Sequence, residues 1–545
     1  MQEQQGISLP QLTSDIVKNA RKTRLDSFAI ALEGWRRGLK LKWYTKDSEH
    51  FQDMIIFGVN PPGRLFSLSS EERTHYFFRT RGDKVENRAV EIGSEKDDTK
   101  EVLLEKGVPV PLGKGFSEDA TDEEIIEYSK TLNYPLVLKP TNASLGNGVV
   151  TNIQDDEGFL KALKYVRQDL GYGEVIVEQF IKGQEYRVYV IEDQVIGAYN
   201  RKPANIIADG VHTIEELIDL KNRERRKNAR LNSCLIDIDI EVLEFIQSSG
   251  YSLESIPDKG ELIYLRQKTN VSSGGDPIDV TDTISDEVKQ IAIDAVKAIP
   301  GLRHAGVDII INENRDIDAE GLVIEINPTA QIGGILYPLK GKARDIPKAI
   351  VDYYFPETKG FDTSKSKIYF DLVEVLEPLE NRSALEVEVA PAPQGQLSMR
   401  KFTVTGNVQK HSYHNWLKKK AFELGVHGSI KNKVYDEIEI IVAAESTDNI
   451  YEFKKAISDC PQYSSVSKVN EELYNEPITI GFEITEKYNV SSSKSVNYTH
   501  RKMEKELIRK ERHLDRVQKD IGHIYNSRSW KATGIIRKVK DQLKK

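Results

Sequence analysis

Residues 319–334 read AEGLVIEINPTAQIGG, and they carry the clearest structural signal in the chain. The apolar run LVI predicts a strand that delivers Glu325 and Asn327 onto one face, because side chains two apart point the same way. Upstream, the segment HAGVDIIIN predicts a second apolar strand that carries Asp308. Two neighbouring strands with these side chains would form an all-oxygen, anionic site of the kind that Mg²⁺ prefers beside bound phosphate. Taken alone, the same residues are equally typical of the solvent-exposed face of a sheet.

Length and composition predict several domains of ordinary globular character. The chain has 545 residues, of which 39% are hydrophobic and 30% charged, and domains average roughly 150 residues. There is no apolar run of about 18 residues, so we expect no membrane span. The first residues lack a signal-peptide pattern. Cys234 and Cys460 lie far apart, which excludes a disulfide framework and suits a reducing cytoplasm. We therefore expect a cytoplasmic protein.

Residues 1–93 are expected to form a small α/β unit. The segment 27–44 predicts an amphipathic helix that ends at Gly38 and is followed by a short strand. Such a unit would either hold part of a substrate or serve only for packing.

The next segment combines a helix, two strands and a glycine-bearing loop. Ser94 is a plausible N-cap for a helix that stops at Gly107. A buried strand then ends in Lys139, and the small-residue loop 141–148 follows. Backbone N–H groups of such a loop can close over phosphates, with the lysine as a point charge. The loop is not a Walker A motif, and many hairpins contain one glycine.

Three further strands are predicted within residues 174–204. Alternation places Glu185, Arg187 and Tyr189 on one face, and the last strand ends near Arg201. Basic residues on the same sheet as the predicted metal carboxylates would suit a polyphosphate. Without that context they would be ordinary surface charges.

The order of these segments resembles the ATP-grasp superfamily of carboxylate–amine ligases over about residues 90–357. The segments at 208–219 and 252–282 are similar to the ligase module of bifunctional glutathione synthetases and to cyanophycin synthetase. The motifs that carry the resemblance are SEKDDTK at 94–100, VLKP at 137–140, VEQFIKGQEYRV at 177–188, VDIII at 307–311 and VIEINP at 323–328.

This resemblance implies an ATP-grasp fold and a ligase that uses ATP and Mg²⁺ or Mn²⁺ to join a carboxylate to an amine through an acyl phosphate. Both steps build up anionic charge, so cations should line the site. The nucleotide-binding residues implied are Lys96, Lys139, Ser144, Gly146, Gly148, Glu178, Phe180, Ile181, Glu185 and Arg187. The metal-binding residues implied are Asp308, Glu325 and Asn327, and the catalytic residues are Arg201, Arg266 and Asn270.

The charged insertion 205–262 is a candidate lid, because an acyl phosphate must be kept from water. Within it, residues 221–232 read KNRERRKNARLN and are strongly basic. We expect a solvated helix face there. The alternative is capture of an acidic substrate.

Residues 368–485 predict a second unit with the order strand–helix–strand–strand–helix–strand, and its centre resembles acylphosphatases. That resemblance implies a ferredoxin-like α/β sandwich. Asn432 matches the asparagine that orients water in the family. His414 occupies the position of the family's phosphate-binding arginine, and Lys410 replaces a loop glycine. A histidine is mostly neutral near pH 7. We therefore expect a degenerate binding or assembly module without hydrolase activity.

The tail 498–545 holds 15 lysines and arginines against 6 acidic residues, on a chain whose net charge is −8. A heptad stripe favours a short coiled coil and a homo-oligomer, or a lone amphipathic helix on the body. The last segment is similar to one that follows coiled coils in surface-polysaccharide glycosyltransferases, and it could lie on an anionic membrane. A solvated tail is the alternative, and we expect no nucleic-acid binding. The stripe consists of Met503, Leu507, Lys510, Leu514, Val517, Ile521 and Ile524.

The sequence thus predicts an α/β multidomain protein with an N-terminal unit (1–93), an ATP-grasp domain (94–357), an acylphosphatase-like domain (368–485) and a helical tail (498–545). The predicted function is ligation of small-molecule or polymeric carboxylate and amine substrates, set at a cell-envelope polymer or its precursor, with peripheral attachment at the inner membrane face. One alternative is a soluble dipeptide or γ-glutamyl peptide synthetase. The other is a nucleotide-binding scaffold without ligase activity.

Overall fold

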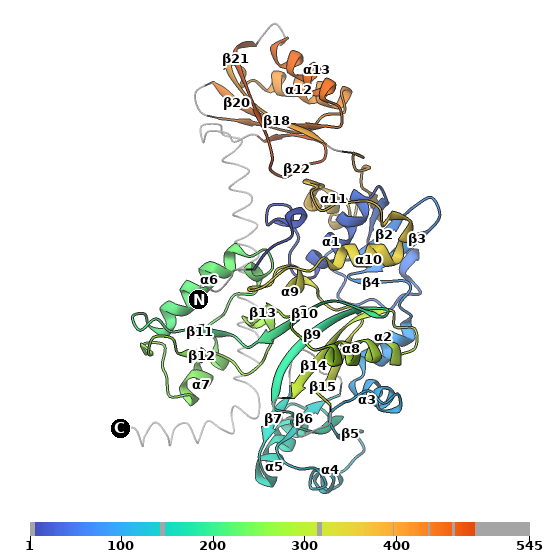
Figure 1. Cartoon of the computed structure of the whole chain (residues 1–545), viewed down its shortest axis with the longest axis vertical. Coiled ribbons are helices and arrows are strands. Elements are labelled where there is room, and N and C mark those ends of the chain that lie inside the picture. The colour runs from blue at the N-terminus through green and yellow to red at the C-terminus, as the bar shows by residue number, and fades with distance from the viewer. Residues whose placement is uncertain are drawn as a thin grey trace.

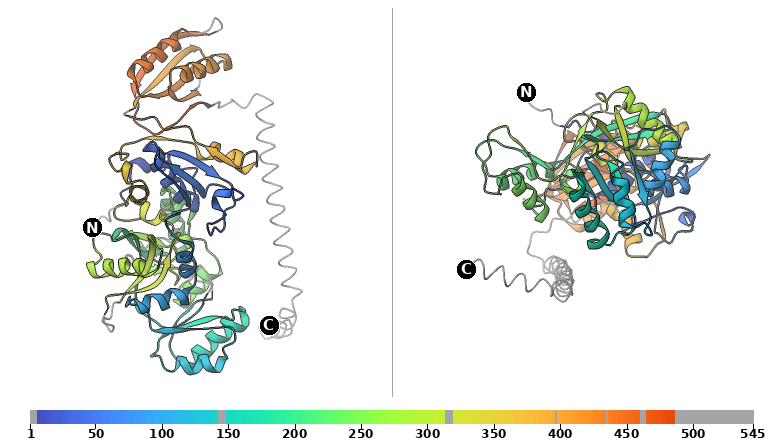
Figure 2. Two further views of the ribbon diagram at one scale, coloured as in Figure 1. Left: turned by 90° about the vertical axis from the view of Figure 1, so that its right-hand side faces the viewer. Right: turned by 90° about the horizontal axis from the view of Figure 1, so that it is seen from below.

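The computed structural model describes residues 6–141, 148–312, 319–395, 397–433, 436–459 and 464–485. They form sheet-containing units that follow one another along the long axis of the molecule (Figure 1; Figure 2). The coiled coil, membrane segment and oligomer contact predicted for 498–545 lie outside the described residues, as do Ser144 and Gly146. Among the described helices, none is long and apolar enough to cross a membrane.

The N-terminal unit is built on helix α1 (Thr23–Arg36), which is buried on every side except at Arg24. Sheet strands pack on one side of α1, and α10 (Ile346–Tyr354) packs on another. The expected amphipathic pattern is therefore wrong for this helix, since each face meets another element rather than water. The sheet has the order β17-β1-β2-β3-β4, with β1 Lys40–Tyr44, β2 Leu65–Ser69, β3 Thr74–Phe78, β4 Arg81–Gly82 and β17 Glu386–Glu388.

Residues 368–392 return to this N-terminal unit and complete its core. The Phe370 ring lies 5.1 Å from that of Phe28 and 5.4 Å from that of Trp35, measured between centroids. The start expected at residue 368 for the second unit therefore falls inside the N-terminal unit, because its apolar side chains bury against α1. The segment contains β16 (Ile368–Tyr369), α11 (Leu372–Glu380) and β17.

A four-stranded sheet with the order β5-β8-β6-β7 forms the smaller lobe of the central unit, and α4 and α5 pack on it. Ser94 is the last residue of α2 and donates to the Val90 carbonyl at 2.7 Å, so Glu95, not Ser94, is the N-cap of α3. The bounds are α2 Asn87–Ser94, α3 Lys96–Glu105, β5 Gly113–Phe116, α4 Asp122–Ser129, β6 Leu136–Pro140, β7 Val150–Ile153, α5 Asp156–Lys164 and β8 Val175–Gln179.

A five-stranded antiparallel sheet with the order β13-β10-β9-β14-β15 forms the larger lobe, and α8 covers one of its faces (Figure 1). The strands predicted around Asp308 and Glu325 are β14 and β15. The bounds are β9 Gly183–Ile191, β10 Gln194–Lys202, β13 Asp276–Asp279, α8 Asp286–Ala298, β14 His304–Asn312, β15 Gly321–Asn327 and α9 Gly333–Leu336.

The insertion between β10 and β13 has a small core of its own. It projects to one side of the larger sheet (Figure 1). Its elements are β11 Asn205–Ile207, α6 Ile214–Lys227, α7 Ile240–Ser248, β12 Leu262–Tyr264 and the short helices Leu231–Ser233 and Val271–Ser273.

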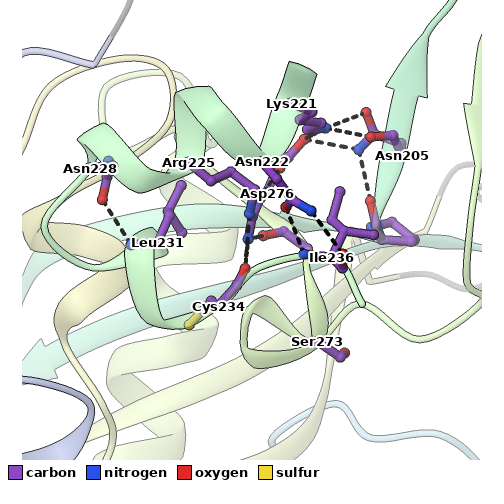
Figure 3. Close-up of polar contacts among 12 residues, drawn as sticks. Asn205, Lys221, Asn222, Arg225, Asn228, Leu231, Cys234, Ile236, Ser273 and Asp276 are labelled. Carbon is purple, nitrogen blue, oxygen red and sulfur yellow. Dashed lines mark hydrogen bonds and ion pairs between the residues drawn. The ribbon is translucent and has the colours of Figure 1, made fainter. Parts of the chain in front are cut away.

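The basic stretch 221–232 is partly buried rather than a solvated face. Arg225 is fully buried and donates to Asp276 at 2.7 Å and to the Cys234 carbonyl, and Lys221 bonds to Asp276 at 2.6 Å (Figure 3). The acidic group that these cations hold is thus Asp276 of the chain itself, and the solvated-face prediction is wrong for them.

The last described unit has the predicted order of strands and helices and is a ferredoxin-like sandwich. Its sheet has the order β21-β18-β20-β19-β23, with two helices packed on one apolar core. The bounds are β18 Ser398–Asn407, α12 His411–Glu423, β19 His427–Asn432, β20 Glu437–Ala444, α13 Thr447–Ser458, β21 Ser465–Leu473 and β23 Phe482–Thr485.

Candidate active site

A row of charged side chains crosses the larger sheet. Arg187 on β9 lies directly opposite Asp308 on β14, and Asp308 lies directly opposite Glu325 on β15. Residues opposite one another in a ladder share a face, and Asn327 follows two positions after Glu325. The sheet register therefore brings together the three residues predicted to hold a metal and places an arginine next to them.

Two arginines hold the Asp308 carboxylate. Arg187 binds both of its oxygens at 2.6 Å, and Arg201 binds one at 2.7 Å while also pairing with Glu185 at 2.6 Å. Burial would raise the pKa of Asp308, but the two guanidinium groups outweigh it and keep the pKa below its usual value. Asp308 is thus a carboxylate fixed in position by charge-assisted hydrogen bonds.

The Glu325 carboxyl, by contrast, lacks such compensation. Burial and the neighbouring Asp308 charge raise its pKa, although Arg187 and Lys96 act in the opposite direction. The Asn327 amide nitrogen is buried without a hydrogen-bond partner in the described part of the chain. A divalent cation bound there would relieve the repulsion between the two carboxylates, so the donor set fits one.

The protein alone would not complete the coordination of that cation. Among the described residues, no cluster of three or more His, Cys, Asp or Glu side chains could hold a metal ion. Mg²⁺ characteristically takes one or two carboxylates and fills its remaining positions with water and phosphate oxygens. The carboxylates of Asp308 and Glu325 and the amide oxygen of Asn327 match this coordination preference.

Lysines on α3 and β6 face the smaller sheet. Lys139 bonds to Glu178 at 2.5 Å, and Lys100 bonds to the other Glu178 oxygen at 2.9 Å. Lys96, one helical turn before Lys100, donates to the Thr141 carbonyl at 3.3 Å, where the predicted phosphate loop begins. Burial lowers the pKa of Lys96, while Glu325 acts to raise it. Sequence reasoning missed Lys100, although its four-residue spacing from Lys96 within SEKDDTK was a signal.

The predicted adenine hinge is only partly available for a ligand. Burial would raise the pKa of Glu178, but Lys139 and Lys100 hold it below its usual value, so the side chain is a buried anion. The Phe180 N–H already donates to the Pro135 carbonyl at 2.9 Å. No hydrogen bond from the Ile181 N–H is found among the described residues, which leaves this donor for a ligand.

Other predicted residues serve local structure. Arg266 pairs with Asp239 and Glu241 of the insertion, both at 2.7 Å, and so holds the start of α7. The Asn270 side chain accepts the Ser272 N–H at 2.9 Å and caps a short helix. No described contact joins either of them to Asp308.

Gly148 ends the predicted phosphate loop with a φ of +69°, and a Cβ there would lie 2.8 Å from Pro140 Cγ. Glycine is therefore the residue that this position accepts. Whether the loop covers phosphates stays a prediction, since residues 142–147 lie outside the described ranges.

In the ferredoxin-like unit, His414 lies on α12 and is 2% exposed. Lys410 is the N-cap of that helix, and Asn432 ends β19 with a buried side-chain oxygen that has no partner among the described residues. A buried histidine thus occupies the position of the family's phosphate-binding arginine. The described side chain at position 414 is not an exposed cation.

Comparisons with known proteins show what the two described units resemble. A family model described as RimK-like ATP-grasp domain matches residues 93–211, and one described as Acylphosphatase matches residues 400–484. The chain is 34% identical over 274 residues to a cyanophycin synthetase of Crocosphaera subtropica, covering 49% of the chain and 31% of that protein. It is also 34% identical over 299 residues to a glutathione biosynthesis bifunctional protein of Clostridium perfringens, covering 53% and 38%.

Among solved structures, the bifunctional glutathione synthetase from Pasteurella multocida matches with 28% identity and a TM-score of 0.43, covering 54% of the chain and 41% of that one. The chain spans about a third of the length of the curated relatives it matches. It contains a RimK-like ATP-grasp domain followed by an acylphosphatase domain.

Proposed function

We propose that the protein is a carboxylate–amine ligase that uses ATP with Mg²⁺ or Mn²⁺. In the first step a carboxylate oxygen of the acid bonds to the γ-phosphorus of ATP, and ADP leaves. In the second step the amine nitrogen bonds to the acyl carbon, phosphate leaves and the nitrogen loses a proton. The observation that carries the proposal is the row Arg187–Asp308–Glu325 across three strands of the larger sheet.

The residue types suit this chemistry. Asp308, Glu325 and Asn327 would hold the cation, which supplies neutralising charge at the transferred phosphoryl group. Arg187 and Arg201 keep the Asp308 carboxylate ionised and fixed. Such preorganised charge stabilises the anionic transition states of both steps without rearrangement.

Lys96 and Lys139 would meet the phosphates of ATP from the opposite side. Lys139 lies on β6 of the smaller sheet and pairs with the buried Glu178, and Lys96 on α3 donates to Thr141 just after β6. A phosphate chain bound there would find cations already in position, which lowers the reorganisation that binding requires.

The insertion would help to keep water from the acyl phosphate. Gln267, which follows β12, donates to Thr151 on β7 at 2.8 Å and so links the insertion to the smaller sheet. Thr269 donates to Glu185 in the charged row. A segment that touches both lobes is suited to close the site during reaction.

For the substrate, we propose that the acid or the amine belongs to a cell-envelope polymer or its precursor. This part of the proposal is supported by the tail sequence alone. It includes peripheral attachment to the membrane and self-association of the chain. A soluble dipeptide or γ-glutamyl peptide synthetase is the alternative enzyme. Truncation at about residue 490 separates them, because a soluble peptide ligase keeps its activity while an envelope enzyme loses its location.

The first test is Mg²⁺-dependent ADP release by the purified full chain, screened against amino acids singly and in pairs, and then with envelope extract. We expect release that needs two specific substrates and that disappears in Glu325→Gln. Glu157→Gln is the matched control, because Glu157 is exposed on α5 and its ion-pair partner among the described residues is Lys161. Tight ATP binding without ADP release under all these conditions would instead identify a nucleotide-binding scaffold.

A further inference from the structure

The loop after β15, residues 328–332, is held in place by the N-terminal unit. An Asp26 carboxylate oxygen accepts the Ile332 N–H at 3.0 Å, and the Thr80 hydroxyl donates to the Ala330 carbonyl at 3.0 Å. Asp26 lies on α1, and Thr80 lies in the turn between β3 and β4. The N-terminal unit therefore borders the loop that continues directly from the predicted metal strand.

The same loop lies beside the charged row and beside the insertion. A Cβ on Gly306 would lie 2.6 Å from the Ala330 Cβ and 3.4 Å from the Arg187 side chain. From the insertion, Arg230 donates to the Gln331 side chain at 2.7 Å. Residues 328–332 are thus a meeting point of the N-terminal unit, the insertion and the row where the proposed reaction occurs.

Arg79 lies in the turn next to Thr80 and has an unusual environment. Its φ is +57°, a left-handed conformation that costs free energy for a residue other than glycine. Its guanidinium lies over the rings of Phe57 and Phe78, 4.9 and 5.0 Å from their centroids. Its Nε is buried without a hydrogen-bond partner among the described residues.

Arg64 completes an arginine cluster, defined here as Arg64, Arg79 and Arg230. Arg64 donates to the Thr23 hydroxyl at 2.7 Å and to the carbonyls of Asn60 and Gly58. The side chains of Arg64 and Arg230 therefore donate to neutral oxygens, whereas the Arg79 guanidinium lies over two aromatic rings. Within the described ranges, none of the three guanidinium groups forms an ion pair with a carboxylate.

The charge of the arginine cluster is poorly balanced. Burial lowers the pKa of Arg79, and the nearby Arg64 charge lowers it further. Asp26 is the acid that faces the cluster, yet it is 1% exposed, and burial raises its pKa to about 7 although Arg230 and Arg79 favour the anion. Its second oxygen is buried and has no partner among the described residues. Arg230 and Arg79 thus face one weakened acid, and Arg64 adds a further positive charge beside Arg79.

Other arginines of the described chain fall into two classes. Arg36 and Arg81 are buried and, like Arg64 and Arg230, donate to neutral oxygens. Arg225 is neutralised by Asp276, Arg37 by Glu33 and Asp352, and Arg344 by Asp279. Burying a charged donor without a hydrogen-bond partner costs free energy, and a bound anion would offset that cost for Arg79, whose Nε has no partner among the described residues. The planar guanidinium fork is best matched by a carboxylate or a phosphate.

We infer that the arginine cluster binds a carboxylate of the substrate that the reaction leaves unchanged. The acid or the amine then carries one more anionic group than ligation uses, and Arg79 and Arg230 select for it. This inference rests on the proposed function. A carboxylate is favoured over a phosphate, because the phosphates of ATP have Lys96 and Lys139 as partners. The residues involved, Arg64 and Arg79, precede residues 93–211, the part matched by the ATP-grasp family.

The test uses the full chain and two probes at equal ionic strength, glutarate and inorganic phosphate, with thermal unfolding as the readout. We expect glutarate to raise the melting temperature of the unmodified chain and of Arg73→Gln, an exposed arginine of the same unit that is paired with Glu72 and Glu357. The increase should be absent in Arg79→Gln and in Arg230→Gln. The second variant covers the case in which the first does not fold.

The inference is overturned if glutarate has no effect on the unmodified chain, if the effect persists in both variants, or if phosphate acts as strongly through Arg79. With the substrates found by ADP release, Arg79→Gln should raise the KM of one of them about tenfold and change kcat little. Arg79→Lys should restore part of the loss. Unchanged KM values beside intact ADP release would refute this inference while leaving the ligase proposal standing.

Discussion

Two groups of arginines, the pair Arg187 and Arg201 and the arginine cluster, differ in what balances their charge. Arg187 and Arg201 share the Asp308 carboxylate, and Arg201 also pairs with Glu185. Within the described ranges, Arg64 and Arg230 donate to neutral oxygens, Arg79 lies over aromatic rings, and the acid beside Arg79 and Arg230 is the weakened Asp26. The first group is complete within the protein, whereas the second lacks an anion.

This difference separates two tasks that one site must perform. Balanced charges on a rigid sheet keep their geometry with or without ligand, which suits groups that stabilise a transition state. An excess of positive charge on turns and loops instead attracts and selects an anion, and its effect on binding weakens as salt increases. We therefore expect changes in the row to act mainly on kcat and changes in the arginine cluster to act mainly on KM.

The largest effect is expected from Asp308→Asn, which removes the charge that Arg187 and Arg201 share. ADP release should fall by about a hundredfold or more, and the free energy of unfolding should fall by about 3–5 kcal/mol. Steady-state kinetics and urea unfolding measure the two effects.

The matched control is Asp276→Asn, which also leaves two buried cations without their acid, Lys221 and Arg225 in the insertion. It should lose comparable stability and keep much more activity per folded molecule. Equal loss of activity in the two variants would mean that Asp308 acts only through folding, and the comparison would fail.

A smaller effect, in the opposite direction, is expected from Asp26→Asn. Burial raises the pKa of Asp26 from 3.8 to about 7, so the folded state holds the proton more tightly than the unfolded state. The stability that this provides is present below pH 4 and is lost as the pH rises through about 7. The asparagine cannot ionise and keeps an oxygen for the Ile332 N–H.

Asp26→Asn should therefore be more stable than the unmodified chain at pH 8, by about 2–4 kcal/mol, and the difference should shrink at pH 5. Urea unfolding at both pH values is the measurement. Arg230, Arg79 and the backbone N–H groups of Ile332 and Gly333 face the carboxyl and favour its ionised form. A variant that is less stable at pH 8 than at pH 5, relative to the unmodified chain, would show that these groups dominate.

A third prediction concerns Lys100, which shares the Glu178 carboxylate with Lys139. In Lys100→Met, Glu178 is left to Lys139 alone and neutralises it more completely, so Lys139 attracts phosphate less. The KM for ATP should rise about tenfold with little change in kcat. Lys114→Met on β5, whose ammonium lies over the Phe116 ring, serves as the control. An unchanged KM for ATP would remove Lys100 from the nucleotide site.

The sequence predicted the strands of the row closely, because short apolar runs with polar residues at alternate positions have one plausible arrangement. HAGVDIIIN coincides with β14, and Asn327 ends β15 as expected. It did not reveal that Asp308 would bind two arginines, because the register between strands far apart in the chain is set by the whole sheet. Contacts over such separations also explain the wrong boundary at residue 368 and the burial of Arg225, whose acid partner lies 51 residues later.

The arginine cluster was missed for the same reason. Arg64 and Arg79 belong to turns of the N-terminal unit, and Arg230 belongs to the insertion. No spacing within one segment signals a group assembled from three parts of the chain. The residues of the row, by contrast, lie in motifs whose order along the chain was itself the signal.

The smallest effect is expected in the ferredoxin-like unit, where a buried histidine replaces the arginine of a phosphate-binding pattern. The His414 ring is 2% exposed, and Lys410 takes the N-cap position of α12. The full chain and Asn432→Ala should therefore hydrolyse benzoyl phosphate at the same rate. The reason is that a water oriented by Asn432 cannot attack a phosphate that the unit does not bind. ADP release should also be unchanged in Asn432→Ala. Faster hydrolysis by the unmodified chain would show that the unit still binds acyl phosphates, and it would place a second phosphate site in the molecule besides the charged row.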